Sequence, residues 1–248
     1  MMTITTTNQD DLLGRVAVIT GGTGGLGNAV CTAFAASGAV VVVVELEQQR
    51  ASAEALIARE TAQGHRMDFV PADVLDETSV AAMVAEVLRR HGRVDVLVNL
   101  VGGFAAGDPI TQLDLAVWQH MLDLNVRSTF LVSKHAARVM TQGGGGRILN
   151  ISSRGARAGR KHAAAYAVAK AAVITLTEVQ AEELRDQDIT VNCILPSIID
   201  TPANRAAMPS ADHSRWPQAE EVARVLLFLA SDDAKLISGA AIPVYGRA

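Results

Sequence analysis

The sequence of 248 residues has little cysteine and few aromatic side chains. Cys31 and Cys193 are its two cysteines, and each lies in an apolar, periodic segment. Such residues are usually small buried side chains, so we expect no disulfide and a reducing, cytoplasmic environment. The six histidines do not follow the spacing of metal ligands, and we expect no metal site.

An excess of charge of one sign and long apolar runs are also missing. The formal net charge of -4 gives no reason to expect binding to nucleic acid or to an anionic membrane. The apolar run at residues 39–44 has the length of a strand, and every apolar run falls well short of the roughly 20 residues that span a bilayer. The first residues are polar and rich in Thr, without the basic and apolar regions of a signal peptide. We expect residues 1–12 to form a frayed tail before a single domain over residues 13–248.

Short apolar runs alternate with longer segments of helical periodicity. The expected strands are residues 16–20, 40–45, 67–70, 94–99, 147–152, 189–195 and 241–244. The expected helices are residues 26–37, 48–63, 77–91, 115–141, 163–186 and 219–229. Several strand runs are β-branched and apolar throughout, as in strands that are buried on both faces. The alternation predicts an α/β fold: a single-domain, doubly wound Rossmann fold with a parallel sheet of about seven strands and helices on both faces.

A glycine-rich turn follows the first expected strand. Residues 20–27 read Thr-Gly-Gly-Thr-Gly-Gly-Leu-Gly and open a helix, a pattern that lets the backbone approach a pyrophosphate at a helix N-terminus. Glu45 lies 24 residues after Gly21, at the end of the second strand, where a carboxylate accepts hydrogen bonds from a free ribose and repels a 2′-phosphate. No Arg stands at position 46, and no basic residue lies within residues 22–27. The sequence therefore predicts binding of NAD in preference to NADP.

Tyr166 and Lys170 lie four residues apart in an expected helix and therefore share one face of it. An ammonium group near a phenol favours the phenolate and lowers the phenol's pKa from about 10. Tyr166 is thus a candidate acid or base for moving a proton on or off an alcohol oxygen. The pair alone is a weak signal, because the same spacing is common on helix surfaces.

Together these motifs resemble those of the short-chain dehydrogenase/reductase family, from about Leu13 to the end of the chain. The resemblance adds Asn125 and Ser153 to the pair, with Ser153 placed 13 residues before Tyr166. It implies that Tyr166 exchanges a proton with the substrate oxygen and that Ser153 binds this oxygen. It also implies that Lys170 holds its charge near the phenol and bonds the nicotinamide ribose. Asn125 would support a water relay from Lys170 to solvent.

The same resemblance extends the expected cofactor site to the ends of later strands. Asp73 matches an acidic position that meets the adenine in the family, and Thr201 is retained after the sixth strand. Two stretches depart from the family pattern: residues 99–102 read Asn-Leu-Val-Gly in place of Asn-Asn-Ala-Gly, and Ser197 replaces a Gly after Pro196. The residues expected to bind the cofactor are Thr20, Gly21, Thr23, Gly25, Leu26, Gly27, Glu45, Asp73, Val74, Asn99, Tyr166, Lys170 and Thr201.

Residues 197–217 are rich in proline and predict a long loop, which we interpret as a flap on the substrate side. This flap is similar to the corresponding segment of dihydropteridine reductases. Phe104, Arg154 and Trp216 are candidates to contact the substrate. The basic loop, residues 154–162, either attracts a carboxylate or phosphate of the substrate or faces solvent or a neighbouring subunit. Both interpretations stay open at this point.

The function expected from these residues is NAD(H)-dependent interconversion of a ketone and a secondary alcohol. A dihydropteridine- or quinone-type NADH reductase and a 3-oxoacyl thioester reductase are alternatives, and a catalytically silent NAD-binding sensor is the non-enzymatic one. The family's usual assembly implies a homotetramer, or a homodimer, built through the helices at 115–141 and 163–186. Substrate identity, stereochemistry and physiological direction are left open by the sequence.

Overall fold

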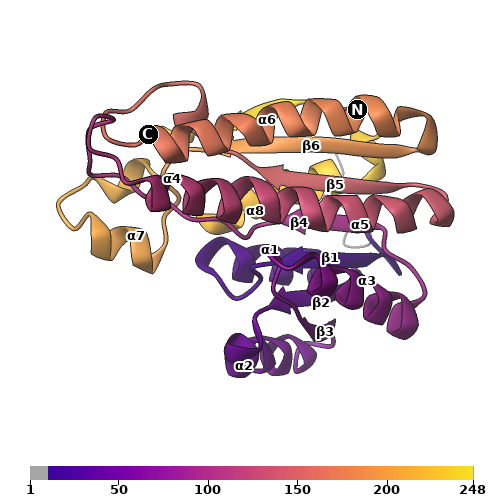
Figure 1. The fold of residues 1–248 in the computed structure, drawn as a ribbon. Helices are drawn as coiled ribbons and strands as arrows, with labels where there is room; N and C mark the ends of the chain where they lie inside the picture. Colours follow the sequence, from indigo (N-terminus) through magenta and orange to yellow (C-terminus); the bar gives the residue numbers. More distant parts are fainter. Residues whose placement is uncertain (1–10, 248) are drawn as a thin grey trace, which may run out of the picture.

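The computed structural model describes residues 11–247, which form one seven-stranded sheet. The strand order is β3-β2-β1-β4-β5-β6-β7, and every neighbouring pair is parallel (Figure 1). The strands are β1 (Val16–Thr20), β2 (Val40–Glu45), β3 (Arg66–Pro71), β4 (Val96–Asn99), β5 (Gly146–Ile151), β6 (Ile189–Pro196) and β7 (Ala241–Val244). The structure confirms the predicted doubly wound α/β fold.

Helices cover both faces of this sheet (Figure 1). They are α1 (Gly25–Ala36), α2 (Arg50–Thr61), α3 (Glu77–His91), α4 (Leu115–Leu122), α5 (Ser128–Gly143), α6 (Ala164–Leu184), α7 (Pro202–Ala207) and α8 (Ala219–Ala230), with a π-helical turn, Asp123–Arg127, between α4 and α5. Apolar residues of α1, α2 and α8 pack on one face, and those of α3, α5 and α6 pack on the other. A third, smaller cluster joins α4 to the start of α6.

The central strands are apolar throughout because both of their faces are covered. Val18 of β1 pairs with Val42 of β2 on one side and with Leu97 of β4 on the other, and all three are buried. Successive side chains of a strand point to opposite faces, so Val18 packs under one helical layer and Ile19 under the other. The continuous apolar runs read from the sequence are thus the interior of a two-sided core.

Several predicted boundaries in the N-terminal half differ from the structure, and two of the differences have a visible physical cause. Leu12, assigned to the tail, is fully buried in the core, and its amide donates to the Ser37 carbonyl at 3.0 Å. The domain therefore includes Leu12, while residues 1–10 of the expected tail lie outside the described residues. The fourth strand begins two residues later than predicted; just before it, the Asp95 side chain accepts a 2.8 Å hydrogen bond from the Val16 amide.

The predicted single helix over residues 115–141 is two helices joined by the π-helical turn. Two hydroxyl groups support this turn: Ser128 Oγ donates to the Leu124 carbonyl at 2.6 Å, and Thr129 Oγ1 donates to the Asn125 carbonyl at 2.9 Å. Turns of this kind widen the helix locally and are frequent at functional sites. Hydrophobic periodicity does not reveal the turn, because the apolar face continues through it.

The flap is more than a loop, because α7 begins within it. Thr201 caps this helix by accepting a 3.2 Å hydrogen bond from the Asn204 amide, and Pro202 occupies its first turn. The Thr-Pro pair is a helix-start signal, but the number of prolines in residues 197–217 predicts a loop throughout. Figure 1 shows α7 at the same end of the molecule as the C-terminus.

The stem of the flap is closed by the buried side chain of Asp200. Its carboxylate accepts hydrogen bonds from two nitrogens of Arg205, at 2.5 and 2.6 Å, and from the Gln218 amide at 2.8 Å. The C-terminal tail then holds the flap from outside, since the Arg247 amide donates to the Arg215 carbonyl at 3.3 Å. Both ends of the flap are therefore fixed to each other and to the tail.

Cys31 and Cys193 are buried and form no disulfide, as predicted. Burial raises the pKa of the Cys193 thiol to about 11, so the thiol stays protonated at physiological pH. Within the described residues, no helix combines the length and the apolar character needed to cross a bilayer.

Gly27 is the position where α1 approaches the preceding turn most closely. A Cβ there would lie 2.1 Å from the Gly21 carbonyl oxygen, which is a backbone atom. We predict that Gly27→Ala lowers the free energy of unfolding by about 3 kcal/mol, the upper part of the range for overpacking. Urea denaturation measures the change. Gly143→Ala is the matched control, since a Cβ there meets nothing within 4 Å; equal stability of the two variants would contradict this reading.

Candidate active site

The candidate site lies at the carboxyl edge of the sheet, at the point where the strand order reverses. β1 sits between β2 and β4, and in doubly wound folds a crevice opens outside such a point. The glycine-rich turn follows β1, Glu45 ends β2, and Ser153 follows β5. The topology thus brings the predicted residues to one edge from separate parts of the chain.

The glycine-rich turn is tied to the segment after β4. Gly21 has φ +72°, in the left-handed region that favours glycine, and a Cβ there would lie 3.2 Å from the Val101 amide nitrogen. Thr20 Oγ1 accepts a hydrogen bond from the Leu100 amide at 3.1 Å. These contacts use backbone atoms of Leu100 and Val101, which explains how the chain accommodates its departure from the family pattern there.

The N-terminus of α1 is open to an anion. Its N-cap residue, Gly24, provides no side-chain cap, and the first turn holds no acidic residue. The amide groups and the positive end of the helix dipole therefore remain for a ligand. Thr201 lies directly over this turn, because a Cβ on Gly25 would be 2.8 Å from its Cγ2 atom. The structure places the start of α7 against the start of α1.

Glu45 reaches back from the end of β2 to the glycine-rich turn. Its Oε1 atom accepts hydrogen bonds from the Thr23 amide at 2.9 Å and from the Thr23 hydroxyl at 2.7 Å. Both bonds use the same oxygen, so the other carboxylate oxygen has lone pairs for a ligand. Thr23 thus has a role that the glycine motif does not convey: it fixes the carboxylate that would face the ribose.

Asp73 and Val74 follow β3 and form the next part of the edge. Asp73 Oδ1 accepts a 2.9 Å hydrogen bond from the Leu75 amide, and the Asp73 amide donates to Ser79 Oγ at 3.0 Å. Val74 is buried. The carboxylate of Asp73 is exposed at this turn.

Asn99 differs from the other predicted cofactor residues, because its side chain lies in the core. Its Nδ2 atom donates to Ser133 Oγ at 2.9 Å and to Asn150 Oδ1 at 2.8 Å. Asn150 in turn donates to Thr177 Oγ1 at 3.0 Å. This buried chain of polar groups fastens β4 to β5 and to α6, so the contribution of Asn99 to the crevice is limited to its backbone.

Tyr166 lies in the first turn of α6 and hydrogen-bonds the side chain of Ser153. Ser153 Oγ also accepts a 3.1 Å hydrogen bond from the Gly155 amide, which fixes the hydroxyl. Burial raises the pKa of Tyr166 above its ordinary value of 10, and the bond from Ser153 offsets part of this effect. The expected lowering of this pKa by Lys170 is therefore wrong for this structure: desolvation is the larger effect, and the phenol is neutral.

Lys170 is buried behind this pair. Its ammonium donates to the Ile151 carbonyl at 2.9 Å, and within residues 11–247 no carboxylate lies within ion-pair distance of it. Burial in a poorly solvated place disfavours the charged form and lowers the pKa of Lys170 from 10.5 to about 8. The ammonium can therefore lose its proton close to physiological pH.

Asn125 connects the π-helical turn to the segment after β4. Its Oδ1 atom accepts from the Gly103 amide at 3.1 Å, while Nδ2 donates to the Gly103 carbonyl at 3.2 Å and to the Met121 carbonyl at 2.9 Å. A Cβ on Gly102 would lie 2.8 Å from Asn125 Oδ1 and 3.1 Å from Lys170 Nζ. Asn125 and Lys170 thus meet against one glycine.

The structure places the three candidate substrate residues in different surroundings. Phe104 contacts Tyr166 edge to face, with ring centroids 4.9 Å apart, and the Arg160 guanidinium lies 6.0 Å from the Phe104 centroid. Trp216 is buried inside the flap against His213, with centroids 4.5 Å apart. The structure thus brings Phe104, and not Trp216, into contact with Tyr166. The sequence does not distinguish Arg160 from the other cations of its basic loop, because its contact partner, Phe104, is 56 residues away.

Arg154 packs against the C-terminal tail. Its guanidinium lies 5.8 Å from the centre of the Tyr245 ring. Ser197, which replaces the family's Gly, donates from its hydroxyl to the Tyr245 carbonyl at 2.7 Å. The tail thus joins the loop after Ser153 to the start of the flap.

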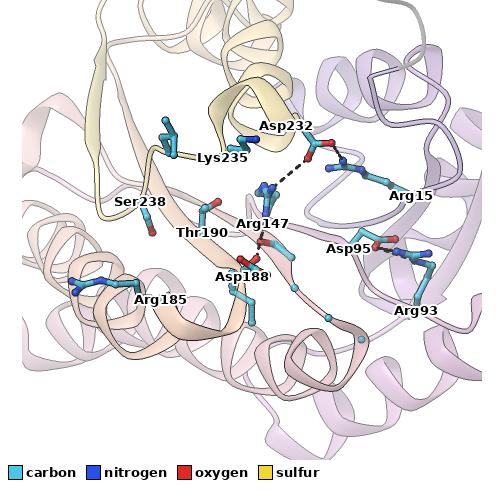
Figure 2. A pocket seen from close by; sticks show the side chains of 16 residues that line it. Arg15, Arg93, Asp95, Arg147, Arg185, Asp188, Thr190, Asp232, Lys235 and Ser238 are labelled. Atoms are coloured by element: carbon cyan, nitrogen blue, oxygen red, sulfur yellow. Dashed lines mark hydrogen bonds and ion pairs between the residues drawn. The ribbon is translucent and has the colours of Figure 1, made fainter.

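A separate hollow of about 770 Å³ lies at the opposite, amino edge of the sheet (Figure 2). Arg15 and Arg147 both contact Asp232 there, at 2.5 and 3.3 Å, and Arg93 contacts Asp95 at 2.5 Å. Cations at this edge face the carbonyl ends of helices, where positive charge is favourable. We interpret this cluster as structural and do not include it in the candidate site.

The carboxyl edge of the sheet holds groups that suit a dinucleotide. The uncapped N-terminus of α1 suits a pyrophosphate, and the second carboxylate oxygen of Glu45 suits a ribose hydroxyl. Beyond them lie a neutral phenol, a fixed hydroxyl and a buried amine, on Tyr166, Ser153 and Lys170. This set can move a proton to or from an oxygen atom and stabilise charge on it.

Comparison with known proteins agrees with this geometry. A family model described as enoyl-(acyl carrier protein) reductase matches residues 21–246. Cis-4-hydroxycyclohexanecarboxylate dehydrogenase of Sinomonas cyclohexanicum is 35% identical over 240 residues, covering 94% of this chain and 95% of the relative. The 3-oxoacyl-[acyl-carrier-protein] reductase of Synechocystis sp. is 36% identical over 228 residues, covering 90% of this chain and 92% of the relative. Levodione reductase of Leifsonia aquatica is 31% identical over 261 residues, covering 99% and 98%.

The fold has close counterparts among solved structures. A short-chain type dehydrogenase/reductase from Mycobacterium ulcerans superposes with a TM-score of 0.89 at 34% identity, covering 95% of this chain and 90% of that one. The chain therefore belongs to the short-chain dehydrogenase/reductase family. It is an oxidoreductase of that family, whose members use nicotinamide cofactors.

The lowered pKa of Lys170 predicts a pH-dependent difference in stability. Between pH 8 and 10.5 the unfolded chain binds the Lys170 proton and the folded chain does not, so the free energy of unfolding rises with pH. Below pH 8 the cost of the buried charge is fully present. We predict that, from pH 7 to 9.5, the free energy of unfolding of the wild type rises by about 2 kcal/mol relative to that of Lys170→Met. Urea denaturation at both pH values tests this, with the exposed Lys235→Met as control; parallel wild-type and Lys170→Met curves would refute it.

Proposed function

We propose that this protein is an NAD(H)-dependent oxidoreductase that interconverts a ketone and a secondary alcohol. The observation that supports this most directly is the hydrogen-bonded pair of Ser153 and Tyr166, with the amine of Lys170 buried behind it. Two hydroxyl groups of this kind can hold one substrate oxygen between them. The relatives whose printed names describe alcohol dehydrogenation or ketone reduction support the same reaction class.

Tyr166 acts as the proton donor in reduction. Its raised pKa keeps the phenol protonated at physiological pH, so it can protonate the carbonyl oxygen as negative charge develops there. Ser153 donates a hydrogen bond to the same oxygen and stabilises that charge. In the oxidative direction the same phenol oxygen accepts the proton of the alcohol.

Lys170 and Asn125 support the proton transfer. With a pKa of about 8, Lys170 is charged in most molecules at neutral pH, and it can release and regain its proton close to that pH. Asn125 fixes the segment after β4 through Gly103. The proposed path returns a proton from solvent through water at Asn125 to Lys170 and then to Tyr166.

The cofactor would lie across the carboxyl edge of the sheet. Gly25, Leu26 and Gly27 would hold the pyrophosphate through the N-terminus of α1, and Thr201 would cover it from the flap. Glu45 would bind the adenosine ribose, with Asp73 beyond it. When bound, the nicotinamide supplies or accepts the hydride, and the chain provides position and the proton.

Glu45 is the basis for proposing NAD over NADP. Its carboxylate is fixed by Thr23 at the edge of the turn, where a 2′-phosphate would meet a like charge. Leu46, which follows it, is exposed and carries no charge to offset the repulsion. The position that would hold an arginine in a phosphate-binding site is apolar.

Two alternative classes of substrate are proposed with less support: a 3-oxoacyl thioester, and a dihydropterin or quinone. Acetoacetyl-CoA reductase of Allochromatium vinosum, 32% identical to this chain, and 3-oxoacyl-[acyl-carrier-protein] reductases among the relatives keep a 3-oxoacyl thioester in consideration. A dihydropterin or quinone rests on the likeness of the flap alone. The experiment below separates all of them.

Self-association through α4, α5 and α6 is part of the proposal. These helices expose large apolar side chains at Leu115, Phe130, Val168 and Val179. Such residues on neighbouring helices favour burial against a second copy, in a homotetramer or a homodimer. Two buried thiols that form no disulfide, Cys31 and Cys193, support a cytoplasmic location.

We predict that Tyr166→Phe lowers kcat for ketone reduction by at least about 100-fold, the scale of a lost general acid, without lost NADH binding. The measurement is NADH oxidation against simple ketones, cyclic diketones, a 3-oxoacyl thioester, a quinone and a quinonoid dihydropterin. Fluorescence titration with NADH is the control for an intact cofactor site. Turnover of the pterin or quinone that survives the substitution would favour the alternative, and no turnover of any compound would count against the proposed reaction.

We predict that the double variant Glu45→Ala with Leu46→Arg shifts the ratio of kcat/KM for NADH over NADPH at least about tenfold toward NADPH. The change removes a like charge from the 2′-phosphate and adds an arginine, which binds phosphate well. Glu47→Ala is the matched control, because Glu47 is exposed and paired with Arg50 away from the turn. Native protein that uses NADPH as well as NADH would show that Glu45 does not set the preference.

A further inference from the structure

Three side chains lie in series from the candidate proton donor to a cation. The Tyr166 ring contacts Phe104 edge to face, with centroids 4.9 Å apart, and the Arg160 guanidinium lies 6.0 Å from the Phe104 centroid. Phe104 is 58% exposed, so the ring between the phenol and the cation is largely uncovered. An uncovered aromatic ring beside a catalytic tyrosine offers a contact surface for the apolar body of a ligand.

The backbone holds Arg160 near this ring. The Gly107 amide donates to the His162 carbonyl at 2.9 Å, which joins the segment after β4 to the loop before α6. The Ala163 amide donates to the Arg160 carbonyl at 3.3 Å and closes a tight turn. His162 within this turn has φ +64°, an uncommon value for a residue other than glycine. The backbone that carries Arg160 is therefore fixed by contacts between two loops.

Three cations of this loop are not paired with carboxylates of residues 11–247. Arg157, Arg160 and Lys161 are exposed, and none has an ion-pair partner among residues 11–247. Asp108 follows the Gly107 contact but forms no ion pair with them within the same residues. Arginines elsewhere on the surface, such as Arg90 and Arg205, pair with carboxylates at 2.5 to 2.9 Å.

Stacking on an aromatic ring leaves the donors of a guanidinium free. A cation over a ring is attracted to the ring face, while the N–H groups point outward in the guanidinium plane and match a carboxylate. The ring also limits the motion of the arginine, so less side-chain entropy is lost on binding. One guanidinium neutralises a single charge, which fits a carboxylate.

We propose that the substrate of this enzyme carries a carboxylate, bound by Arg160, with its apolar body on Phe104 and its reacting oxygen at Tyr166. This inference rests on the proposed function, because it names the substrate class of the same site. It chooses between the two interpretations of the basic loop: Arg160 faces the substrate. Arg160 is then the residue that separates acidic from neutral ketones.

The test compares 4-oxocyclohexanecarboxylate and 4-oxopentanoate, each beside its methyl ester, on the full-length protein. Calorimetry measures binding in the presence of NAD+, which has no hydride to give the ketone, and NADH oxidation measures kcat/KM. We expect each acid to bind at least about tenfold more tightly than its ester, and Arg160→Gln to reduce that ratio about tenfold through KM, the scale of one charged contact. Raising the salt concentration should weaken acid binding.

Two further variants make the test specific. Arg160→Lys should restore part of the preference for the acid, and Arg138→Gln should keep the wild-type ratio, because Arg138 is an exposed arginine on α5. Equal binding of acid and ester to the wild type, or an acid preference that survives Arg160→Gln, overturns the inference. Because binding is read separately from turnover, a protein that reduces neutral ketones through Tyr166 without preferring the acids would refute this inference and leave the proposed function standing. Binding of the acid that depends on Arg160, in a protein that does not reduce it, would support this inference and count against the proposed function.

Discussion

The burial of one ammonium group, without a carboxylate partner in the described part of the chain, is the constraint on which the site depends. Lys170 is held by the Ile151 carbonyl at the end of β5 and lies against Gly102, which also contacts Asn125. A methyl group at position 102 would lie too close to both polar side chains. Asn125, on the π-helical turn, and Lys170 therefore keep these positions because residue 102 is a glycine. A buried charge costs stability, and here the cost leaves the amine able to exchange its proton near neutral pH.

The parts of the molecule that follow local patterns could be predicted from the sequence. The bounds of β1, β2, β7 and α3 were read correctly, because continuous β-branched runs and a helical period need no distant partner. The glycine-rich turn and the spacing of Tyr166 and Lys170 are local in the same sense. Once the alternation of strands and helices gives a parallel sheet, the edge that carries the site follows from the topology.

The parts that depend on contacts between distant residues could not be predicted. Leu12 packs in the core although its neighbours are polar, and the π-helical turn is hidden within a continuous apolar face. The pKa of Tyr166 rises because tertiary packing removes water, an effect that the i, i+4 spacing with Lys170 does not contain. Thr23 and Glu45 are 22 residues apart in the chain, and their hydrogen bond forms because β1 and β2 lie side by side.

Chemistry and recognition are supported by different parts of this chain. Tyr166 and Lys170 stand on a long helix, so their geometry is set by the core. The loop after Ser153 and the start of the flap are joined to each other through the C-terminal tail, since Tyr245 contacts both Arg154 and Ser197. A glycine at position 197 has no hydroxyl with which to make that second contact. A change in the tail would therefore move the loop after Ser153 and the start of the flap together, altering recognition while the proton-transfer residues keep their places.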